Sequence, residues 1–137
     1  MSEHCFRYAQ QPKAEPSEVK RPYVLLELQS LQGEWFKVNA LADTGADITC
    51  FPRGVSRLLG MQLKARKKMT LVSATGQKLP LYLHQVNVRF GSKESIMTVG
   101  FAETDIFPYL LGRKDVLDHF SMKFGKDDIW FLTEHTV

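Results

Sequence analysis

Apolar and polar residues alternate along several short stretches of this chain, which is the pattern of half-buried β-strands. In residues 85–90, QVNVRF, every second residue is apolar, and residues 97–101 repeat that alternation. Residues 23–31 and 34–42 are two further strand candidates, and Gly33 supplies the turn between them. The spacing therefore predicts a chain built mainly from short strands.

Two short helices are expected where apolar residues recur at helical spacing. The first covers residues 54–60, and Gly60 ends it. The second follows an apolar strand within residues 109–120, YLLGRKDVLDHF. The residues expected to form the buried faces are Val55, Leu58 and Leu59 in the first helix and Val116, Leu117 and Phe120 in the second.

Two hairpins complete the expected fold. Residues 74–77, ATGQ, are polar and contain a glycine, so they are expected to form the tip of one hairpin. Residues 121–132 are expected to form the second hairpin, with its turn at residues 125–128. Short strands separated by turn signals are typical of an all-β fold, either a closed barrel or a sandwich.

The first 20 residues differ in composition from the rest of the chain. They are mostly polar and contain Pro12 and Pro16, so we expect residues 1–20 to be a flexible tail before a domain at residues 21–137. They lack the apolar core of a signal peptide. No stretch of the chain is long and apolar enough to predict a membrane span, so no membrane partner is expected.

Composition and charge narrow the functional classes. The 137 residues are 44% hydrophobic, which fits one domain with a modest core. A formal net charge of +3 is too small to indicate nucleic acid, and the basic run KARKK at residues 64–68 has no aromatic residues between its cations. Cys5 and Cys50 form no disulfide framework, which favours a reducing, cytoplasmic setting. The histidines lack metal-site spacing, so neither a metal nor another cofactor is expected.

The run LADTGADITCFP at residues 41–52 is the strongest chemical signal. Asp43 directly follows an apolar stretch, and Gly45 tolerates a close approach of the backbone, so we expect a buried turn. A buried carboxylate needs partners. Two facing carboxylates cannot both ionise readily, so one can take a proton from water while the other donates to a peptide carbonyl. Because the chain has one such run, the second aspartate must come from a second copy.

Two motifs together resemble those of the retropepsins, the retroviral-type aspartic proteases. Residues 40–47, ALADTGAD, are similar to their active-site signature, and residues 109–120 are similar to their second hallmark, an apolar pair and a glycine followed by an arginine and a short helix. The resemblance covers residues 22–132, and the C-terminal part most resembles cellular and bacterial members. It implies a closed β-barrel with a flap hairpin and one or two short helices, one lobe per chain.

The resemblance also implies roles for individual residues. Asp43 is the implied catalytic residue, and Thr44 and Gly45 complete the active-site loop, with the Thr44 hydroxyl interlocked with its mate across the dimer axis. Substrate contacts are implied for residues of the first motif and the flap, namely Ala46, Asp47, Ala74, Thr75 and Gly76. Structural support is implied for the second motif, namely Leu110, Leu111, Gly112 and Arg113, the last paired with Asp47.

The flap hairpin departs from the viral pattern. Viral members often have several glycines there, whereas this hairpin has Gly76 alone and Pro80 follows it closely. Because proline limits strand pairing and stiffens the chain, the flap is expected to be shorter or less mobile than a viral one.

The resulting hypothesis is an aspartic endopeptidase that acts as a homodimer on protein or peptide substrates. Its alternatives are a catalytically silent dimeric peptide-binding module of the same fold, a structural dimer with the Asp run as a polar clamp, and Asp43 as an ordinary turn residue. Asp47 and Arg113 could form a purely structural ion pair. The tail could be a substrate for self-processing. A thiol protease is disfavoured, because the sequence shows no histidine with an asparagine or aspartate arranged near Cys50.

Overall fold

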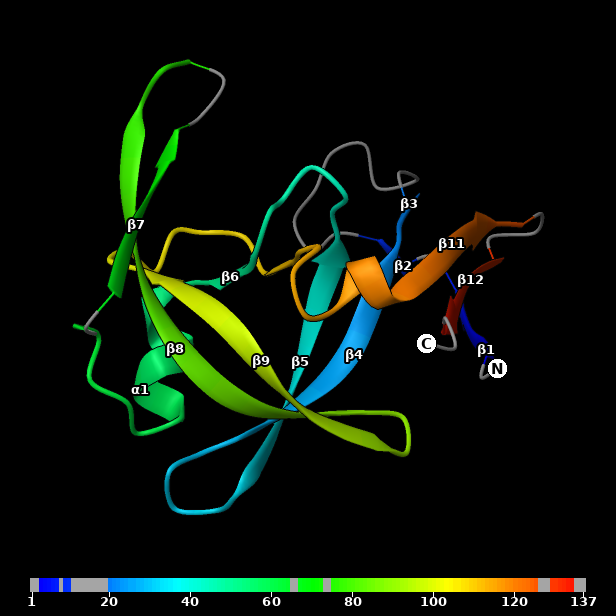
Figure 1. Ribbon diagram of the computed structural model, residues 1–137, viewed down its shortest axis with the longest axis horizontal. Coiled ribbons are helices and arrows are strands. Elements are labelled where there is room, and N and C mark those ends of the chain that lie inside the picture. The colour runs from blue at the N-terminus through cyan, green and yellow to red at the C-terminus, as the bar shows by residue number, and fades with distance from the viewer. Residues whose placement is uncertain are drawn as a thin grey trace.

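The computed structural model describes residues 3–7, 9–10, 20–64, 67–72, 75–125 and 129–134, most of which lie in strands (Figure 1). The N-terminal strands are β1 (Glu3–Arg7), β2 (Ala9–Gln10), β3 (Lys20–Arg21), β4 (Tyr23–Gln29), β5 (Trp35–Ala42) and β6 (Thr49–Phe51). The later strands are β7 (Lys67–Val72), β8 (Lys78–Phe90), β9 (Lys93–Ala102), β10 (Leu110–Leu111), β11 (Phe120–Phe124) and β12 (Ile129–Glu134). The helical segments are α1 (Arg53–Leu58) and the 3₁₀ turn η1 (Leu117–His119).

Six strands of the described chain form a closed barrel. Their order is β4-β5-β10-β6-β9-β8, and a further pairing of β4 with β8 closes the ring. The short strand β10 pairs in parallel with β5 on one side and antiparallel with β6 on the other. The all-β prediction with a closed barrel and very little helix is therefore confirmed.

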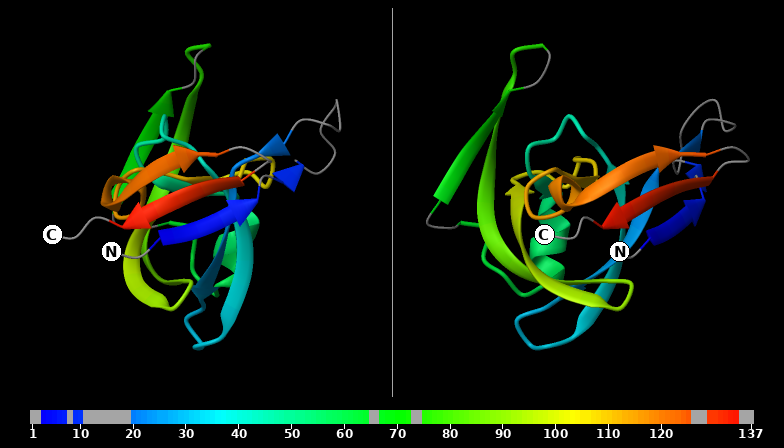
Figure 2. Two further views of the ribbon diagram at one scale, coloured as in Figure 1. Left: turned by 90° about the vertical axis from the view of Figure 1, so that its right-hand side faces the viewer. Right: turned by 45° about the vertical axis from the view of Figure 1, so that its right-hand side comes forward.

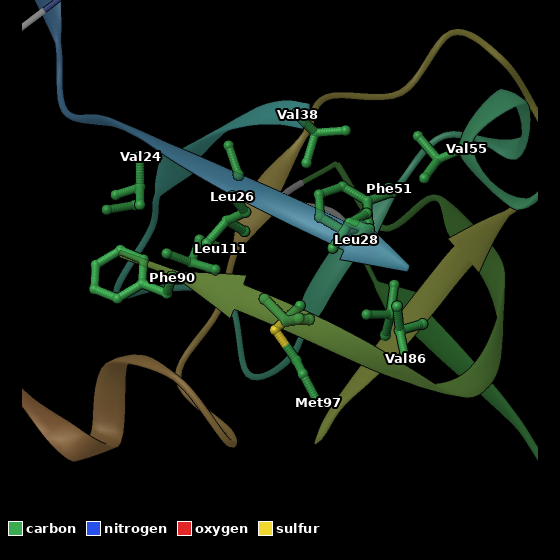
Figure 3. Close-up of a cluster of buried hydrophobic side chains, with 14 of the residues drawn as sticks. Val24, Leu26, Leu28, Val38, Phe51, Val55, Val86, Phe90, Met97 and Leu111 are labelled. Carbon is green, nitrogen blue, oxygen red and sulfur yellow. The ribbon is translucent and has the colours of Figure 1, made fainter. Parts of the chain in front are cut away.

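Alternating side chains from facing strands fill the barrel. In β4 the inward residues are Val24, Leu26 and Leu28, and in β8 they are Val86, Val88 and Phe90; all six are buried (Figure 3). Because side chains alternate along a strand, the apolar face is buried while Gln85 and Asn87 remain exposed. The strand predictions from period-two alternation are confirmed for β4, β5, β8 and β9.

Strand β9 is buried on both of its faces over its second half. Met97, Val99 and Phe101 face the main core as expected, but Thr98 and Ala102 on the other face are buried too. A second apolar cluster covers that face and contains Ile48, Cys50, Leu81 and Ala102. The apolar–polar alternation in the sequence of β9 therefore predicts only one of the two faces that this strand buries.

Helix α1 ends where the sequence predicts but turns a different face inward. Gly60 adopts φ +73°, its N–H donates to the Arg57 carbonyl, and the Met61 N–H donates to the Ser56 carbonyl. These two bonds form a Schellman motif, which requires a left-handed residue after the helix. Val55 and Leu59 are buried, but Leu58 is 46% exposed, so its predicted burial is wrong. Ser56 takes the buried position instead, because its hydroxyl is satisfied by the Arg53 carbonyl at 2.6 Å.

The second predicted helix is reduced to the single turn η1. Leu117 is buried as expected, while Val116 and Phe120 are half-buried and Phe120 already begins β11. Asp115 precedes the turn with φ +65°, a left-handed conformation that a helix does not tolerate. Its Oδ2 accepts a hydrogen bond from the Thr98 N–H at 3.0 Å, which holds the residue in that conformation.

The N-terminal segment contains a paired strand within the stretch that the sequence predicts to be a flexible tail. Residues Glu3–Arg7 form β1 and pair antiparallel with β12, so the terminal strands form a separate sheet in the order β1-β12-β11 (Figure 2). Phe6 stacks on Trp130 with ring centroids 4.9 Å apart, and His4 contacts Phe90 edge-on. This burial of aromatic rings stabilises a strand whose other residues are polar. The predicted tail residues 11–19 lie outside the described residues.

The remaining turn predictions have mixed outcomes. Strands β11 and β12 pair as the predicted C-terminal hairpin, and of its predicted turn, residues 125–128, the last three lie outside the described residues. Gly33 adopts φ +94° in the turn between β4 and β5, as expected. No helix within the described ranges is long and apolar enough to cross a membrane.

Replacing Phe6 by alanine should lower the free energy of unfolding by about 1–3 kcal/mol, because the half-buried ring loses its contact with Trp130. Chemical denaturation measures the change. The control is Cys5→Ala, an exposed residue of the same strand, for which we expect little effect. Equal stability of the two variants would show that β1 contributes nothing to the fold.

Candidate active site

The loop after β5 presents Asp43 on a fixed backbone. The Asp43 N–H donates to the Leu111 carbonyl at 3.0 Å, and the Ala46 N–H donates to the Asp43 carbonyl at 3.1 Å. One carboxylate oxygen, Oδ1, accepts a hydrogen bond from the Gly45 N–H at 2.9 Å. A carboxylate that accepts a backbone N–H has a defined orientation, so the loop sets where the acidic group points.

The tip of this loop is exposed in the single chain. Asp43 and Ala46 are half-buried, while Thr44 and Gly45 are exposed, so the expectation of a buried turn is wrong for the single chain. The structure shows no element of the described chain covering the tip, which leaves the Thr44 hydroxyl accessible at the surface.

Three hydrogen bonds join this loop and the start of β6 to the segment after β10. The Arg113 N–H donates to the Ala46 carbonyl and the Lys114 N–H to the Asp47 carbonyl, both at 2.9 Å. The Gly112 N–H donates to the buried hydroxyl of Thr49 at 3.0 Å. Together with the bond from Asp43 to Leu111, these contacts form a clamp between residues 43–49 and 111–114.

Gly112 is required by the closeness of the two segments in the clamp. A Cβ atom at this position would lie 2.2 Å from the carbonyl carbon and 2.3 Å from the carbonyl oxygen of Ile48. These are backbone atoms of the residue just before β6, so they cannot move aside as a flexible side chain could. The structure thus places Leu111 and Gly112 directly against the loop, where the sequence motif expects them.

Arg113 does not form the ion pair expected from the sequence. Its Nε lies 3.1 Å from Oδ1 of Asp118, whereas Asp47 is exposed and has no side-chain bond to Arg113 within the described chain. Asp118 lies in the same turn, held by its own N–H to the Arg113 carbonyl, so little chain entropy is lost in pairing them. The backbone bonds of the clamp, rather than an ion pair, connect the Asp43 loop to the segment after β10.

The flap residues lie on a hairpin that projects from the barrel. Strands β7 and β8 pair over residues 67–72 and 78–83, and Pro80 lies opposite Thr70 (Figure 1). Thr75 and Gly76 are exposed, and Gly76 adopts φ +85° with nothing within 4 Å of an added Cβ. The Gly76 end of the hairpin therefore stands clear of the rest of the chain. Ala74 lies outside the described residues.

Cys50 lies near the Asp43 loop, but its thiol is unreactive at neutral pH. Burial, followed by the negative charge of Asp43, raises the pKa of its thiol to about 12. The thiol donates to the Ile48 carbonyl at 3.3 Å. Because the thiolate is the nucleophile, a thiol held protonated at neutral pH does not support cysteine chemistry. In the described ranges, no group of three or more histidine, cysteine, aspartate or glutamate side chains is arranged to hold a metal ion.

Two residues with clear structural roles at the site were not identified from the sequence. Thr49 is buried, and its hydroxyl accepts the Gly112 N–H across the clamp. Asp115 had no assigned role, yet it orients the turn after Arg113 through its bond to Thr98. Both partners are distant in sequence, so no local pattern could have identified these bonds.

Comparison with known structures establishes the fold. A scan against protein-family models and a search of curated proteins found no match. Among solved structures, a retropepsin-like aspartic protease from Rickettsia conorii is similar with a TM-score of 0.66 at 20% identity, covering 96% of this chain and 99% of that one. EIAV protease complexed with the inhibitor HBY-793 is similar with a TM-score of 0.57 at 19% identity, covering 77% and 93%. The chain therefore has a retropepsin-like fold.

Replacing Gly112 by alanine should destabilise the protein by more than about 4 kcal/mol, because the new methyl group collides with the backbone of Ile48. The matched control is Gly76→Ala, which meets no neighbour and costs about 1 kcal/mol through its positive φ. Thermal and chemical denaturation compare the two. Similar stabilities would contradict the close packing of the clamp.

In the native protein, one of the two cysteines should react with a thiol reagent at neutral pH. Cys5 is exposed, whereas Cys50 is buried with its pKa raised to about 12 and stays protonated. Counting thiols with a chromogenic disulfide should give one in buffer and both in denaturant. Cys5→Ser should then abolish the native reaction, and rapid native labelling of Cys50 in that variant would contradict the assignment.

Proposed function

We propose that this protein is an aspartic endopeptidase in which two copies of the chain each supply Asp43 to one catalytic dyad. The observation that carries the proposal is the clamp, which holds Asp43 on a rigid backbone while the tip of its loop stays exposed. An aspartate that only stabilises a turn does not require the hydrogen bonds of the clamp. An exposed tip is what a second, identical loop requires if it is to meet the first across a two-fold axis.

The surface beside the loop supports a second copy as the partner. A hollow of about 370 Å³ adjoins Thr44 and is lined by Arg113 and Asp118 together with the apolar side chains of Leu117, Phe120 and Met122. Apolar side chains next to an exposed hydroxyl suit a contact between protomers. In the dimer, the two Thr44 hydroxyl groups would interlock and the two Asp43 carboxylates would face each other.

The dyad would hydrolyse peptide bonds without a covalent intermediate. Two carboxylates facing at short range share one proton. The ionised Asp43 would take a proton from a water molecule, whose oxygen attacks the peptide carbonyl carbon, while the protonated Asp43 donates to the carbonyl oxygen. The proton taken from water then passes to the leaving nitrogen as the carbon–nitrogen bond breaks. Such a dyad needs one protonated and one ionised member, which predicts a bell-shaped pH profile.

The substrate would lie extended between the active-site loop and the flap. Main-chain bonds to Ala46, Asp47 and the flap residues Ala74, Thr75 and Gly76 would hold it as an added strand. The loop before β10 exposes Ile106 and Tyr109, at 91% and 39%, close to the second apolar cluster. These side chains favour a preference for apolar residues around the cleaved bond. With one free cysteine exposed and one buried, we further propose a cytoplasmic location.

Asp43→Asn should lower peptide cleavage about a thousandfold or more while the dimer persists, because asparagine cannot take up the proton from water. A diverse peptide library measured over a pH series and several protein concentrations, with sedimentation on the same samples, tests both parts. The matched control is Glu94→Gln, an exposed carboxylate of β9, which should keep full activity and the bell-shaped profile.

Two outcomes would contradict this function. Undiminished cleavage by Asp43→Asn would exclude the dyad. A wild-type dimer that binds peptides but cleaves none at any pH would identify a silent peptide-binding module instead.

A further inference from the structure

A second hollow, of about 540 Å³, crosses β8 and β9 on the side of the clamp that faces the flap base. It is lined by three lysines and four other residues, namely Lys64, Lys67, Leu83, His84, Gln85, Thr98 and Lys114. Two of the lysines belong to the basic run before the flap, and Lys114 comes from the clamp. The fold thus brings together cations that are about fifty residues apart in sequence.

The lining of this hollow carries positive charge. None of the described residues that line it is acidic. Within the described part of the chain, none of the three ammonium groups has a carboxylate partner, and all three side chains are exposed. The Asp115 carboxylate, next to Lys114 in sequence, accepts the Thr98 N–H and is not among the residues that line the hollow. Three like charges around one concave surface repel each other, and a bound anion would relieve that repulsion.

The lining of the hollow offers a polar donor and, among its described residues, a single aromatic ring, that of His84. Thr98 is buried, and its Oγ1 accepts a hydrogen bond from Gln85 Nε2 at 3.1 Å, so its hydroxyl proton remains free to be donated. The His84 ring lies edge-on to Phe101 and is bonded through Nε2 to the Leu63 carbonyl. Because nucleic-acid sites rely on aromatic platforms, this lining favours a compact anion over a single strand of nucleic acid.

We propose that this hollow binds a phosphate-type polyanion, held by Lys64, Lys67 and Lys114. Lysine ammonium groups are common point-charge ligands of phosphate oxygens, and the volume exceeds that of one phosphate group, so several linked phosphates fit. The phosphoryl groups come either from a free inorganic polyphosphate or from a phosphorylated protein segment.

The site connects two functional parts of the chain. Lys67 begins β7, the first strand of the flap hairpin, and the Lys114 N–H holds the Asp47 carbonyl in the active-site loop. An anion bound to both would tie the flap base to the clamp and stabilise their relative positions. This binding does not depend on peptidase activity.

Titration of the wild-type protein with inorganic tripolyphosphate at low ionic strength tests the site by calorimetry and by thermal denaturation. We expect saturable binding, a higher Tm, and a steep loss of affinity as salt is added. Each of Lys64→Gln, Lys67→Gln and Lys114→Gln should weaken binding about tenfold, since each removes a charge-assisted contact. Failure of tripolyphosphate to bind the wild type would overturn the proposal.

The control is the charge-matched triple variant Lys37→Gln, Lys78→Gln, Lys93→Gln, whose lysines lie outside the hollow. It should bind tripolyphosphate almost as well as the wild type, whereas the triple variant of the three lining lysines should not bind. Equal losses in both triples would show a general charge effect and overturn the site.

Two further probes distinguish the sources of the phosphate group. Binding of a phosphoserine peptide, but not its unphosphorylated form, through the same three lysines would assign the ligand to a protein. Binding of tripolyphosphate alone would assign it to a free anion, and either result supports the site. A single-stranded oligonucleotide that binds more tightly than tripolyphosphate through these lysines would overturn the choice of a compact anion.

Discussion

The hydrogen-bonded clamp between residues 43–49 and 111–114 is the constraint on which the rest of this structure depends. The strand β10 that leads into the clamp also separates β5 from β6 and completes the barrel. One short segment therefore connects β5 to β6 within the barrel and orients the Asp43 loop. Backbone bonds of the same segment hold both the barrel and the Asp43 loop. A change that weakens these bonds should therefore disturb the barrel and the loop together.

Much of the barrel was predictable because its long strands bury one face. In β8 the alternation of Val86, Val88 and Phe90 with polar residues reflects that burial directly. In the second half of β9 the alternation reveals only one of two buried faces, and the two-residue strand β10 was predicted from its apolar residues rather than from alternation. The alternation fails for β1, whose place in the fold is set by Trp130 at the other end of the chain.

At the candidate site, too, features set by neighbouring residues were predictable from the sequence, and features set by long-range contacts were not. The Asp43 loop was predictable because its residues are contiguous and its chemistry is local. The partner of Arg113 was not, because Asp47 and Asp118 are both within reach of the same turn and only the three-dimensional arrangement selects Asp118. The roles of Thr49 and Asp115 depend on bonds that span 63 and 17 residues, for which a single sequence carries no signal.

The terminal sheet has a consequence for how this domain could be built into a larger chain. Strands β1 and β12 are antiparallel neighbours, and Glu3 lies opposite Thr133, so the start of β1 and the end of β12 lie at the same end of the terminal sheet (Figure 2). Polypeptide entering ahead of Glu3 and polypeptide leaving after Glu134 would share one exit point. A domain with that arrangement can be inserted into a surface loop of a host protein as a side branch, without separating the two parts of the host.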